Sequence, residues 1–363
     1  MDRRLSYSLK RTIFMDSSEL RRDLVSGDWI AIAIGRAKRP HAFSRVHHHD
    51  SAYTKRAGCP FEKPQSSGNA PATLVLDYAG RTLSGTRADR EWFTQVIPNR
   101  YPAFMPGEPK KHAVGPFETM DGAGFHELVV SRDHHRHWAQ YTQSEAATVF
   151  RVYRDRYRTL SGERIVQYVA IFHNFGREAG ASLYHPHSQI IAIPVIPPDV
   201  QRSFAGSARY FRRHHRCVHC ALLEWERRKQ GRIIAENRAF VAMCPFVSRS
   251  AFEIRIFPKR HEPCFGNITD REVQEAGDIL RRVLGRLRNR LGNPPYNFFI
   301  HSAPCGRVAL YPHYHWHLEI LPKISVWAGF EIATGIEIST IAPEYAAAFL
   351  RSRSKASRRG ERM

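Results

Sequence analysis

The stretch His185–Pro194, HPHSQIIAIP, has a counterpart later in the chain at His315–Pro322, HWHLEILP. Each stretch places two histidines one residue apart and follows them with a short apolar run that ends in proline. Because side chains at positions i and i+2 of a strand share one face, each pair is predicted to direct two imidazoles to the same side of a sheet. In a chain with 20 histidines, one such pair alone would be weak evidence for a site.

The segments that precede the two pairs are also alike. His134 and His261 each follow an apolar strand, and a Thr-x-x-Glu sequence begins eight residues later, at Thr142 and Thr269. This sequence is the capping box that starts a helix, and apolar residues at helical spacing follow in both places. Each helix leads to a further strand with a histidine, YVAIFHNFG or YNFFIHSAP. The chain is therefore predicted to be an internal duplication.

This duplication predicts an α+β fold with two domains, each an antiparallel sheet with packed helices. The length of 363 residues suits two domains of ordinary size, and we expect them at residues 16–205 and 206–350. Residues 1–15 and 351–363 are rich in arginine and lack apolar periodicity. We expect both ends to be basic and disordered.

The formal net charge of +21 indicates polyanionic partners, and nucleic acid is one candidate. Much of the excess lies in the two ends, however, and arginine-rich coding contributes to it. These observations favour phosphate-bearing small substrates over a dedicated nucleic-acid role, with only non-specific nucleic-acid binding through the tails.

The number of cysteines and the hydropathy pattern predict the cellular compartment of the protein. Six cysteines are too few for a disulfide scaffold in a chain of this length. No stretch is apolar enough to span a bilayer, so we expect no membrane association. The sequence predicts a cytoplasmic protein.

One set of metal ligands is complete in the second half of the chain. Cys217 and Cys220 have the spacing of a metal clip, and His261 and His315 follow. Two thiolates and two imidazoles form a closed tetrahedral zinc site of the structural kind.

The first half offers a similar set with one change. Cys59, His134 and His185 correspond to three of those ligands, and Glu62 stands where the second cysteine would be. A carboxylate can bind zinc, so a Cys/Glu/His/His site is possible. The alternative is a site that has decayed to ordinary packing.

A reacting centre is predicted at the first pair. His187 shares a face with His185, and Gln189 lies two residues further on. Asn174, Gly180 and Ser182, upstream, suit the close approach of phosphate oxygens. A neutral imidazole beside them can attack phosphorus and form a phosphoramidate intermediate, while the glutamine hydrogen-bonds the developing charge.

The second pair is less suited to this chemistry. Glu319 stands at the position that corresponds to the glutamine of the first pair. Because a carboxylate there would repel a phosphate, we place the nucleophile in the first half of the chain.

The segment NFGREAGASLYHPHSQ closely resembles the active-site motif of the galactose-1-phosphate uridylyltransferases, a branch of the histidine-triad superfamily. HWHLEILPKISVWAGFEIATGIEIS resembles the C-terminal signature of the same family, particularly the branch shared with ADP-glucose phosphorylases. RRDLVSGDWIAIAIGRAKRP and VIPNRYPA are similar to its N-terminal motifs. The resemblance covers about residues 18 to 350.

The resemblance implies roles for individual residues. It implies that His187 is the nucleophile that takes a nucleoside monophosphate, and that the His185 carbonyl steers its other ring nitrogen. Phe330 and Glu331 match a stretch that contacts the sugar across a dimer interface. The positions that match substrate-binding residues are Arg36, Arg39, Asn99, Asn174, Gly180, Ser182, Gln189, Phe330 and Glu331. The zinc ligands carry over as Cys59, His134 and His185, and as Cys217, Cys220, His261 and His315.

These observations together predict an enzyme. We expect a homodimeric nucleotidyltransferase that exchanges a nucleoside monophosphate between a nucleotide sugar, such as UDP-glucose, and a hexose 1-phosphate, with Zn²⁺ as cofactor. Three alternatives remain. They are an ADP-sugar phosphorylase with inorganic phosphate as acceptor, a nucleotide-sugar hydrolase, and a nucleic-acid-binding protein that kept a zinc scaffold.

Overall fold

The computed structural model describes residues 18–35 and 53–352. The helices are α1 (Thr86–Arg90), α2 (Gln143–Ser161), α3 (Pro198–His214), α4 (Val218–Lys229), α5 (Asp270–Leu291), α6 (Gly329–Thr334) and α7 (Pro343–Arg351). The strands of the first part are β1 (Glu19–Arg22), β2 (Trp29–Ile32), β3 (Leu74–Asp77), β4 (Trp92–Pro98), β5 (Lys111–Val114), β6 (Phe117–Met120), β7 (Phe125–Ser131), β8 (Tyr168–Phe175) and β9 (His187–Ile193). Those of the second part are β10 (Ile233–Glu236), β11 (Phe240–Met243), β12 (Ile254–Pro258), β13 (Tyr296–His301), β14 (His317–Pro322) and β15 (Ile338–Ser339).

One ten-stranded sheet contains both copies of the duplication. Its strand order is β10-β11-β12-β14-β13-β8-β9-β7-β4-β3, so the sequence β8-β9-β7-β4-β3 is mirrored by β13-β14-β12-β11-β10. We call β3 to β9 with α2 the first repeat, and β10 to β14 with α5 the second repeat. The repeats meet at β8 and β13, which pair antiparallel with His173 opposite Phe298. The α+β fold with antiparallel sheets is confirmed.

The predicted division into two domains stays a prediction. The two repeats share a sheet and a single large apolar core, and the expected boundary after residue 205 falls within α3. The expected tails and the residues Arg36 and Arg39 lie outside the described residues, apart from residues 351 and 352 at the end of α7.

The two capping boxes start the helices that the sequence predicts. Thr142 accepts a hydrogen bond from the Glu145 backbone at 3.2 Å, and α2 follows it. Thr269 accepts one from the Glu272 backbone at 3.2 Å, and α5 follows. Each box satisfies backbone donors that the first helical turn leaves unpaired.

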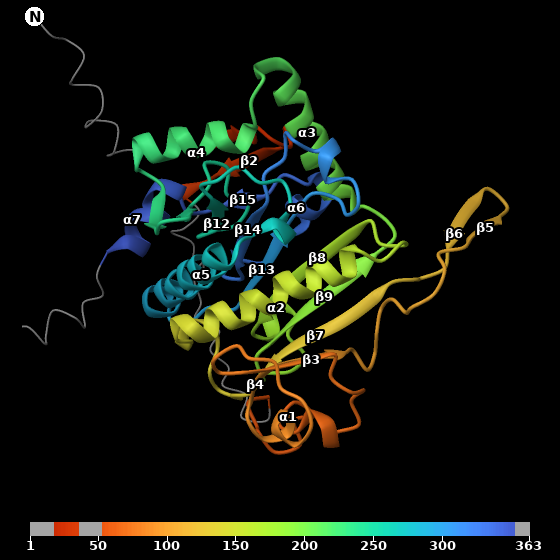
Figure 1. The fold of residues 1–363 in the computed structure, drawn as a ribbon. Helices are drawn as coiled ribbons and strands as arrows, with labels where there is room; N and C mark the ends of the chain where they lie inside the picture. The colour runs from red at the N-terminus through yellow and green to blue at the C-terminus, as the bar shows by residue number, and fades with distance from the viewer. Residues whose placement is uncertain (1–17, 36–52, 353–363) are drawn as a thin grey trace, which may run out of the picture.

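Helices α2 and α5 lie side by side on one face of the sheet (Figure 1). Their closest approach is at Gly277, where an added Cβ would lie 2.7 Å from the backbone of Ala146 and Ala147. A side chain at this position would therefore separate the helices. We call this side of the sheet the helical face.

Helix α4 covers the opposite face of the second repeat. Its Leu223 packs with Val241 and Phe257, which point away from the helical face because side chains alternate along a strand. The corresponding face of the first repeat carries the side chains of His187 and Gln189. We call this side of the first repeat the open face.

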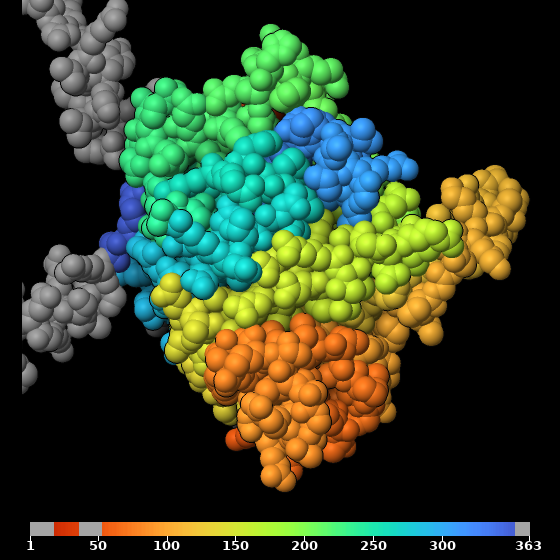
Figure 2. All heavy atoms as spheres, in the orientation of Figure 1, coloured from red at the N-terminus to blue at the C-terminus, as the bar shows by residue number. Residues whose placement is uncertain are grey.

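The β5–β6 hairpin projects from the body of the molecule (Figure 2). Val114 and Phe117 near its turn are exposed. Within residues 18–35 and 53–352, no helix is both long and apolar enough to cross a membrane.

Candidate functional site

His187 is the first residue of β9, and a hydrogen bond to the nearby backbone fixes the orientation of its ring. Nδ1 donates a hydrogen bond to the carbonyl oxygen of His185 at 2.8 Å. A carbonyl only accepts, so the proton is on Nδ1 and the lone pair is on Nε2. Burial lowers the pKa of His187 below its usual value, although the carbonyl acts in the opposite direction. The ring is therefore neutral at neutral pH, with a nucleophilic nitrogen at Nε2.

Gln189, two residues along β9, has its side-chain amide oriented by His126 of β7. Ala103 N–H donates to Nδ1 of His126 at 3.2 Å, so this nitrogen carries the lone pair and Nε2 carries the proton. Nε2 lies 2.8 Å from Oε1 of Gln189 and donates to it. The amide oxygen is thus held by His126, and the NH₂ group remains to donate to a ligand.

Asn99 joins the same group at the end of β4. Its Oδ1 accepts from Tyr101 N–H at 3.0 Å, and its Nδ2 donates to Nδ1 of His126, the nitrogen with the lone pair, at 3.5 Å. The predicted substrate residues Asn99 and Gln189 are therefore brought together by a histidine.

The glycine-rich turn after β8 lies beside this group. Gly176 and Gly180 have φ values of +86° and +84°, which L side chains rarely adopt. Asn174 Oδ1 accepts from Nδ2 of Asn297 at 2.8 Å, across the junction of the two repeats. Ser182 is exposed on the same loop. The turn thus offers backbone and polar side-chain groups close to β9.

The first metal group contains three side chains whose ligand atoms lie within 4.8 Å of one another: Cys59, His134 and His185. His185 Nε2 donates to the carbonyl of Ser131 at 2.6 Å, and His134 Nε2 donates to the carbonyl of Thr54 at 3.2 Å. Both Nδ1 atoms therefore carry lone pairs, yet they lie only 3.1 Å apart. Two lone pairs at this distance repel each other unless a cation lies between them.

Glu62 approaches the same point. Its Oε1 lies 3.0 Å from Nδ1 of His134 and 3.6 Å from Nδ1 of His185. This buried oxygen makes no hydrogen bond to any residue that the structure describes, whereas Oε2 accepts from Arg56 at 2.6 Å. The carboxylate therefore approaches the two imidazoles, although Glu62 is not one of the three residues whose ligand atoms all lie within 4.8 Å of one another, and the first group offers three donors to a metal with this carboxylate beside them.

The second metal group contains all four predicted ligands: Cys217, Cys220, His261 and His315. Cys220 Sγ lies 3.3 Å from Nδ1 of His261 and 3.5 Å from Nδ1 of His315. Nε2 of His261 donates to the carbonyl of Pro312 at 2.9 Å, which leaves Nδ1 with a lone pair toward the thiols.

These distances fit zinc. With zinc–nitrogen bonds of about 2.0–2.1 Å and zinc–sulfur bonds of about 2.3 Å, tetrahedral geometry separates two nitrogens by about 3.3 Å. It separates a nitrogen and a sulfur by about 3.6 Å. The second group therefore has four donors of the types and spacings of a tetrahedral zinc site, and the first has three such donors with the Glu62 carboxylate beside the imidazoles.

The second repeat has a counterpart of His187, His317, whose ring is covered by other side chains. His317 Nδ1 donates to the carbonyl of His315 at 3.0 Å, as in the first repeat. However, its ring stacks on Phe257 with centroids 4.8 Å apart, and His219 of α4 lies at 5.1 Å. Burial lowers the pKa of His317 to about 4. The hydrogen-bond geometry of His187 therefore recurs at His317, on a ring that is 3% exposed against 8% for His187.

Glu319 of the second repeat is neutralised by arginines. It lies 3.0 Å from Arg255 and 2.8 Å from Arg249. Burial alone would raise its pKa, but the charges of these two arginines hold the pKa well below its usual range. Because Arg249 and Arg255 pair with Glu319, its charge would repel a phosphate only weakly. The second repeat therefore differs from the first by its burial under α4 rather than by repulsion of phosphate. The same pairing makes the cluster of His301, His317 and Glu319 a poor cation site.

Phe330 and Glu331 lie in α6 and are both at the surface. Phe330 is 50% exposed, and Glu331 accepts a hydrogen bond from Ala328 N–H of its own helix. Their predicted contact with the sugar from a second subunit stays a prediction.

Two residues near His187 were not predicted from the sequence. His126 orients Gln189, and the Phe61 ring lies against His187 with centroids 5.2 Å apart. The alternation of FHELVVS places His126 on one face with Leu128 and Val130, but only the pairing of β7 with β9 shows that this is the face of Gln189.

Comparisons with known proteins show which family this chain resembles over most of its length. A sequence model of the N-terminal domain of galactose-1-phosphate uridyl transferase matches residues 11–197. A second model, described as a domain of unknown function, matches residues 110–363.

Similar proteins extend over nearly the whole chain. An ADP-glucose phosphorylase from Arabidopsis thaliana is 32% identical over 341 residues, covering 92% of this chain and 93% of that protein. A galactose-1-phosphate uridylyltransferase from Thermotoga maritima is 26% identical over 343 residues, covering 92% and 98%. A crystal structure of the Arabidopsis thaliana ADP-glucose phosphorylase with bound ADP-glucose matches with a TM-score of 0.76 and 29% identity, over 93% of this chain and 100% of that chain. This chain therefore belongs to the galactose-1-phosphate uridylyltransferase family of nucleotidyltransferases.

Proposed function

We propose that this enzyme exchanges a nucleoside monophosphate between a nucleotide sugar, UDP-glucose, and a hexose 1-phosphate through a covalent intermediate on His187. The orientation of His187 carries this proposal, because its Nδ1 proton is held by the His185 carbonyl at 2.8 Å. Nε2 thus presents a lone pair from a rigid strand.

In the first step, Nε2 attacks the α-phosphorus of the nucleotide sugar. A nitrogen–phosphorus bond forms, and the bond from phosphorus to the bridging oxygen breaks and releases hexose 1-phosphate. The ring becomes positively charged in this step, so its hydrogen bond to the His185 carbonyl grows stronger. In the second step, a phosphate oxygen of the acceptor attacks the same phosphorus, and the neutral ring is restored.

Gln189 stabilises the charge on the non-bridging oxygens. Because His126 holds its Oε1 at 2.8 Å, the amide NH₂ is the end that donates to the phosphate. Such a donor is already in position before the reaction, so it costs little reorganisation in the transition state. We assign substrate contacts also to Asn99, Asn174, Gly180 and Ser182, which surround the same face.

A second candidate function is ADP-sugar phosphorolysis. It uses the same His187 chemistry with an adenine nucleotide and with inorganic phosphate as the acceptor. The identity of 32% to the ADP-glucose phosphorylase, against 26% to the uridylyltransferase, supports this alternative.

We assign both metal groups to structural zinc, because the second is closed by four protein ligands and the first has three with the Glu62 carboxylate beside two of them. Zinc in the first group would fix His185, whose carbonyl orients His187. The chain's own residues then bind and transfer the nucleotide. We also propose a cytoplasmic homodimer in which Phe330 and Glu331 of one subunit contact the sugar bound to the other.

The decisive experiment compares acceptors. The enzyme is incubated with UDP-glucose or ADP-glucose, each alone, with galactose 1-phosphate, or with inorganic phosphate. Products are identified, and the intact protein mass is measured without acid. A uridylyl adduct and UDP-galactose support the first function, and an adenylyl adduct with ADP formed from phosphate supports the second. Turnover without any nucleotidylated protein would contradict both.

A further inference from the structure

A cavity of about 120 Å³ lies on the helical face, behind the strand that carries His187. Phe175 and Tyr296 line it, and these aromatic rings stack across the junction of β8 and β13 with centroids 5.0 Å apart. Asn174, the neighbour of Phe175, points to the other face because side chains alternate along a strand. The cavity is therefore separate from the nucleotide-binding face, and we call it the α5 pocket.

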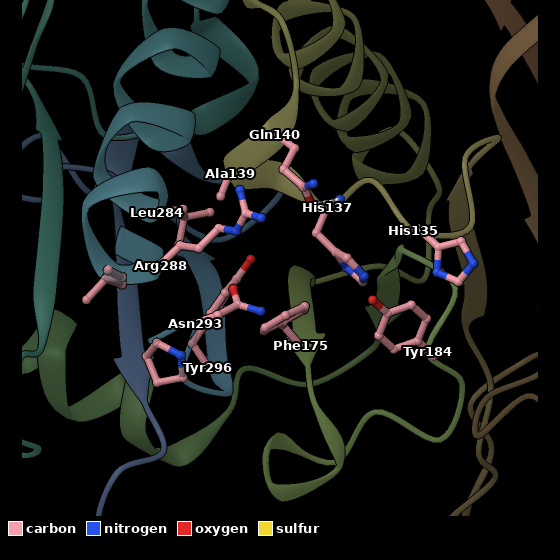
Figure 3. A pocket seen from close by; sticks show the side chains of 12 residues that line it. His135, His137, Ala139, Gln140, Phe175, Tyr184, Leu284, Arg288, Asn293 and Tyr296 are labelled. Carbon is pink, nitrogen blue, oxygen red and sulfur yellow. Dashed lines mark hydrogen bonds between the residues drawn. The ribbon is translucent and has the colours of Figure 1, made fainter. Parts of the chain in front are cut away.

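An exposed arginine at the edge of the α5 pocket has no partner among the described residues. Arg288 lies in the last turn of α5 and points toward the cavity (Figure 3). Among the described residues, its guanidinium makes no hydrogen bond and no ion pair. No aspartate or glutamate of this part of the chain lines the cavity. The charge of Arg288 is thus available to an anion.

A buried histidine faces the same space. His137 is only 7% exposed, and neither of its ring nitrogens has a hydrogen-bond partner within the described chain. Its ring lies between Phe175 and Tyr184, with centroids 4.6 Å and 4.9 Å away, and points into the cavity beside the Tyr184 hydroxyl (Figure 3). Buried polar atoms in proteins nearly always have partners, so these nitrogens mark a position for a ligand group or a water.

The other lining residues indicate the chemical character and the size of a ligand that fits the pocket. Asn293 adds a side-chain amide near Arg288, whereas Phe175, Tyr296 and two leucines of α5 form an apolar surface. The cavity volume of about 120 Å³ is close to the roughly 150 Å³ of a protein cavity that accepts a benzene ring, so it suits a single small ring. An intact nucleotide is too large for this space.

We propose that the α5 pocket binds a small organic anion. A single carboxylate or phosphate group would pair with Arg288, and a compact apolar or planar body would lie against Phe175 and Tyr296. Tyr184 directly precedes His185, so such a ligand would contact the segment that also supports the nucleophile. None of the residues that line this pocket is assigned above to the nucleotide, so binding here can be measured without nucleotidyl transfer.

The probe for this site is benzoate, whose carboxylate and ring match the two parts of the pocket. Binding to the full chain is measured by calorimetry or by ligand-observed NMR, with benzyl alcohol as the neutral analogue. We expect benzoate to bind, benzyl alcohol to bind at least about tenfold more weakly, and Arg288→Gln to weaken benzoate by a similar factor.

Two further variants make the result specific. Arg282→Gln, on the same helix, removes the same charge from a residue that pairs with Asp278 at 3.4 Å and does not line the pocket. It should leave benzoate affinity unchanged. Ala139→Leu, which fills the pocket from its wall, should weaken binding. Equal affinities for Arg288→Gln and Arg282→Gln, or displacement of benzoate by UDP-glucose, would overturn the proposal.

Discussion

The imidazole of His219, on α4, lies against the imidazole of His317, on β14, with the ring centroids 5.1 Å apart. His317 occupies the place in the second repeat that His187 occupies in the first, and both donate Nδ1–H to a carbonyl two residues earlier. Helix α4 therefore closes one copy of a duplicated site. The proposed difference in function between the repeats would then come from what lies over each histidine, Phe61 at His187 and α4 at His317.

We expect His187→Asn to abolish nucleotidylated protein and to lower turnover by at least roughly a thousandfold, because the covalent intermediate needs Nε2. Intact mass and steady-state rates measure this, and thermal unfolding should remain close to that of the wild type. Near-normal turnover in the variant would refute the assignment.

The equivalent change in the second repeat, His317→Asn, should leave the amount of nucleotidylated protein per folded chain unchanged. Since His317 is buried, the variant should unfold at a lower temperature than the wild type. The two variants form a matched pair, measured by the same intact-mass experiment. A loss of the adduct in His317→Asn at full folding would show that the second repeat takes part in the chemistry.

We expect Gln189→Ala to lower kcat by about a hundredfold or more, as for the loss of one oriented donor to a developing charge. His126→Ala should lower kcat by about tenfold, with a small change in KM, because the amide of Gln189 can then rotate. The key measurement is the double variant. If His126 acts through Gln189, adding His126→Ala to Gln189→Ala should have no further effect; independent, multiplying losses would contradict this role.

Metal analysis of the purified protein should find about two zinc ions per chain, one for each metal group. Cys220→Ser should remove zinc from the second group and destabilise the protein. Cys305→Ser is the control, since Cys305 is a buried free cysteine outside both groups.

The first group is tested separately by Glu62→Gln, which should weaken the retention of its zinc because a neutral amide replaces a carboxylate ligand. Retention is measured against a chelator. Wild-type protein with zinc only in the second group would show that the first group does not hold the metal.

Thr269→Ala should destabilise the protein by about 1 kcal/mol, because it removes the hydroxyl that caps α5. Urea unfolding measures the free energy. Thr159→Ala, near the end of α2, is the comparison, since its hydroxyl only bonds back to a carbonyl of its own helix. Equal effects of the two changes would mean that the cap contributes nothing specific.

Much of the local structure could be predicted from the sequence. The capping boxes at Thr142 and Thr269 start α2 and α5 because the signal lies within four consecutive residues. The paired histidines lead into β9 and β14, although each strand begins at the second histidine of its pair rather than the first. The metal ligands of the second group also come together as predicted, since donor type and spacing are readable in a single chain.

The sequence by itself therefore determined the duplication, the α+β fold, the candidate nucleophile and the candidate ligands, because each depends on residues close together or on a repeated pattern. Only the tertiary structure decided that the repeats share one sheet, that His126 holds Gln189, and that α4 covers His317. These features depend on strand register and on the docking of a helix far away in sequence. A one-residue shift of β7 against β9 would turn His126 to the other face, and FHELVVS alone does not fix that register.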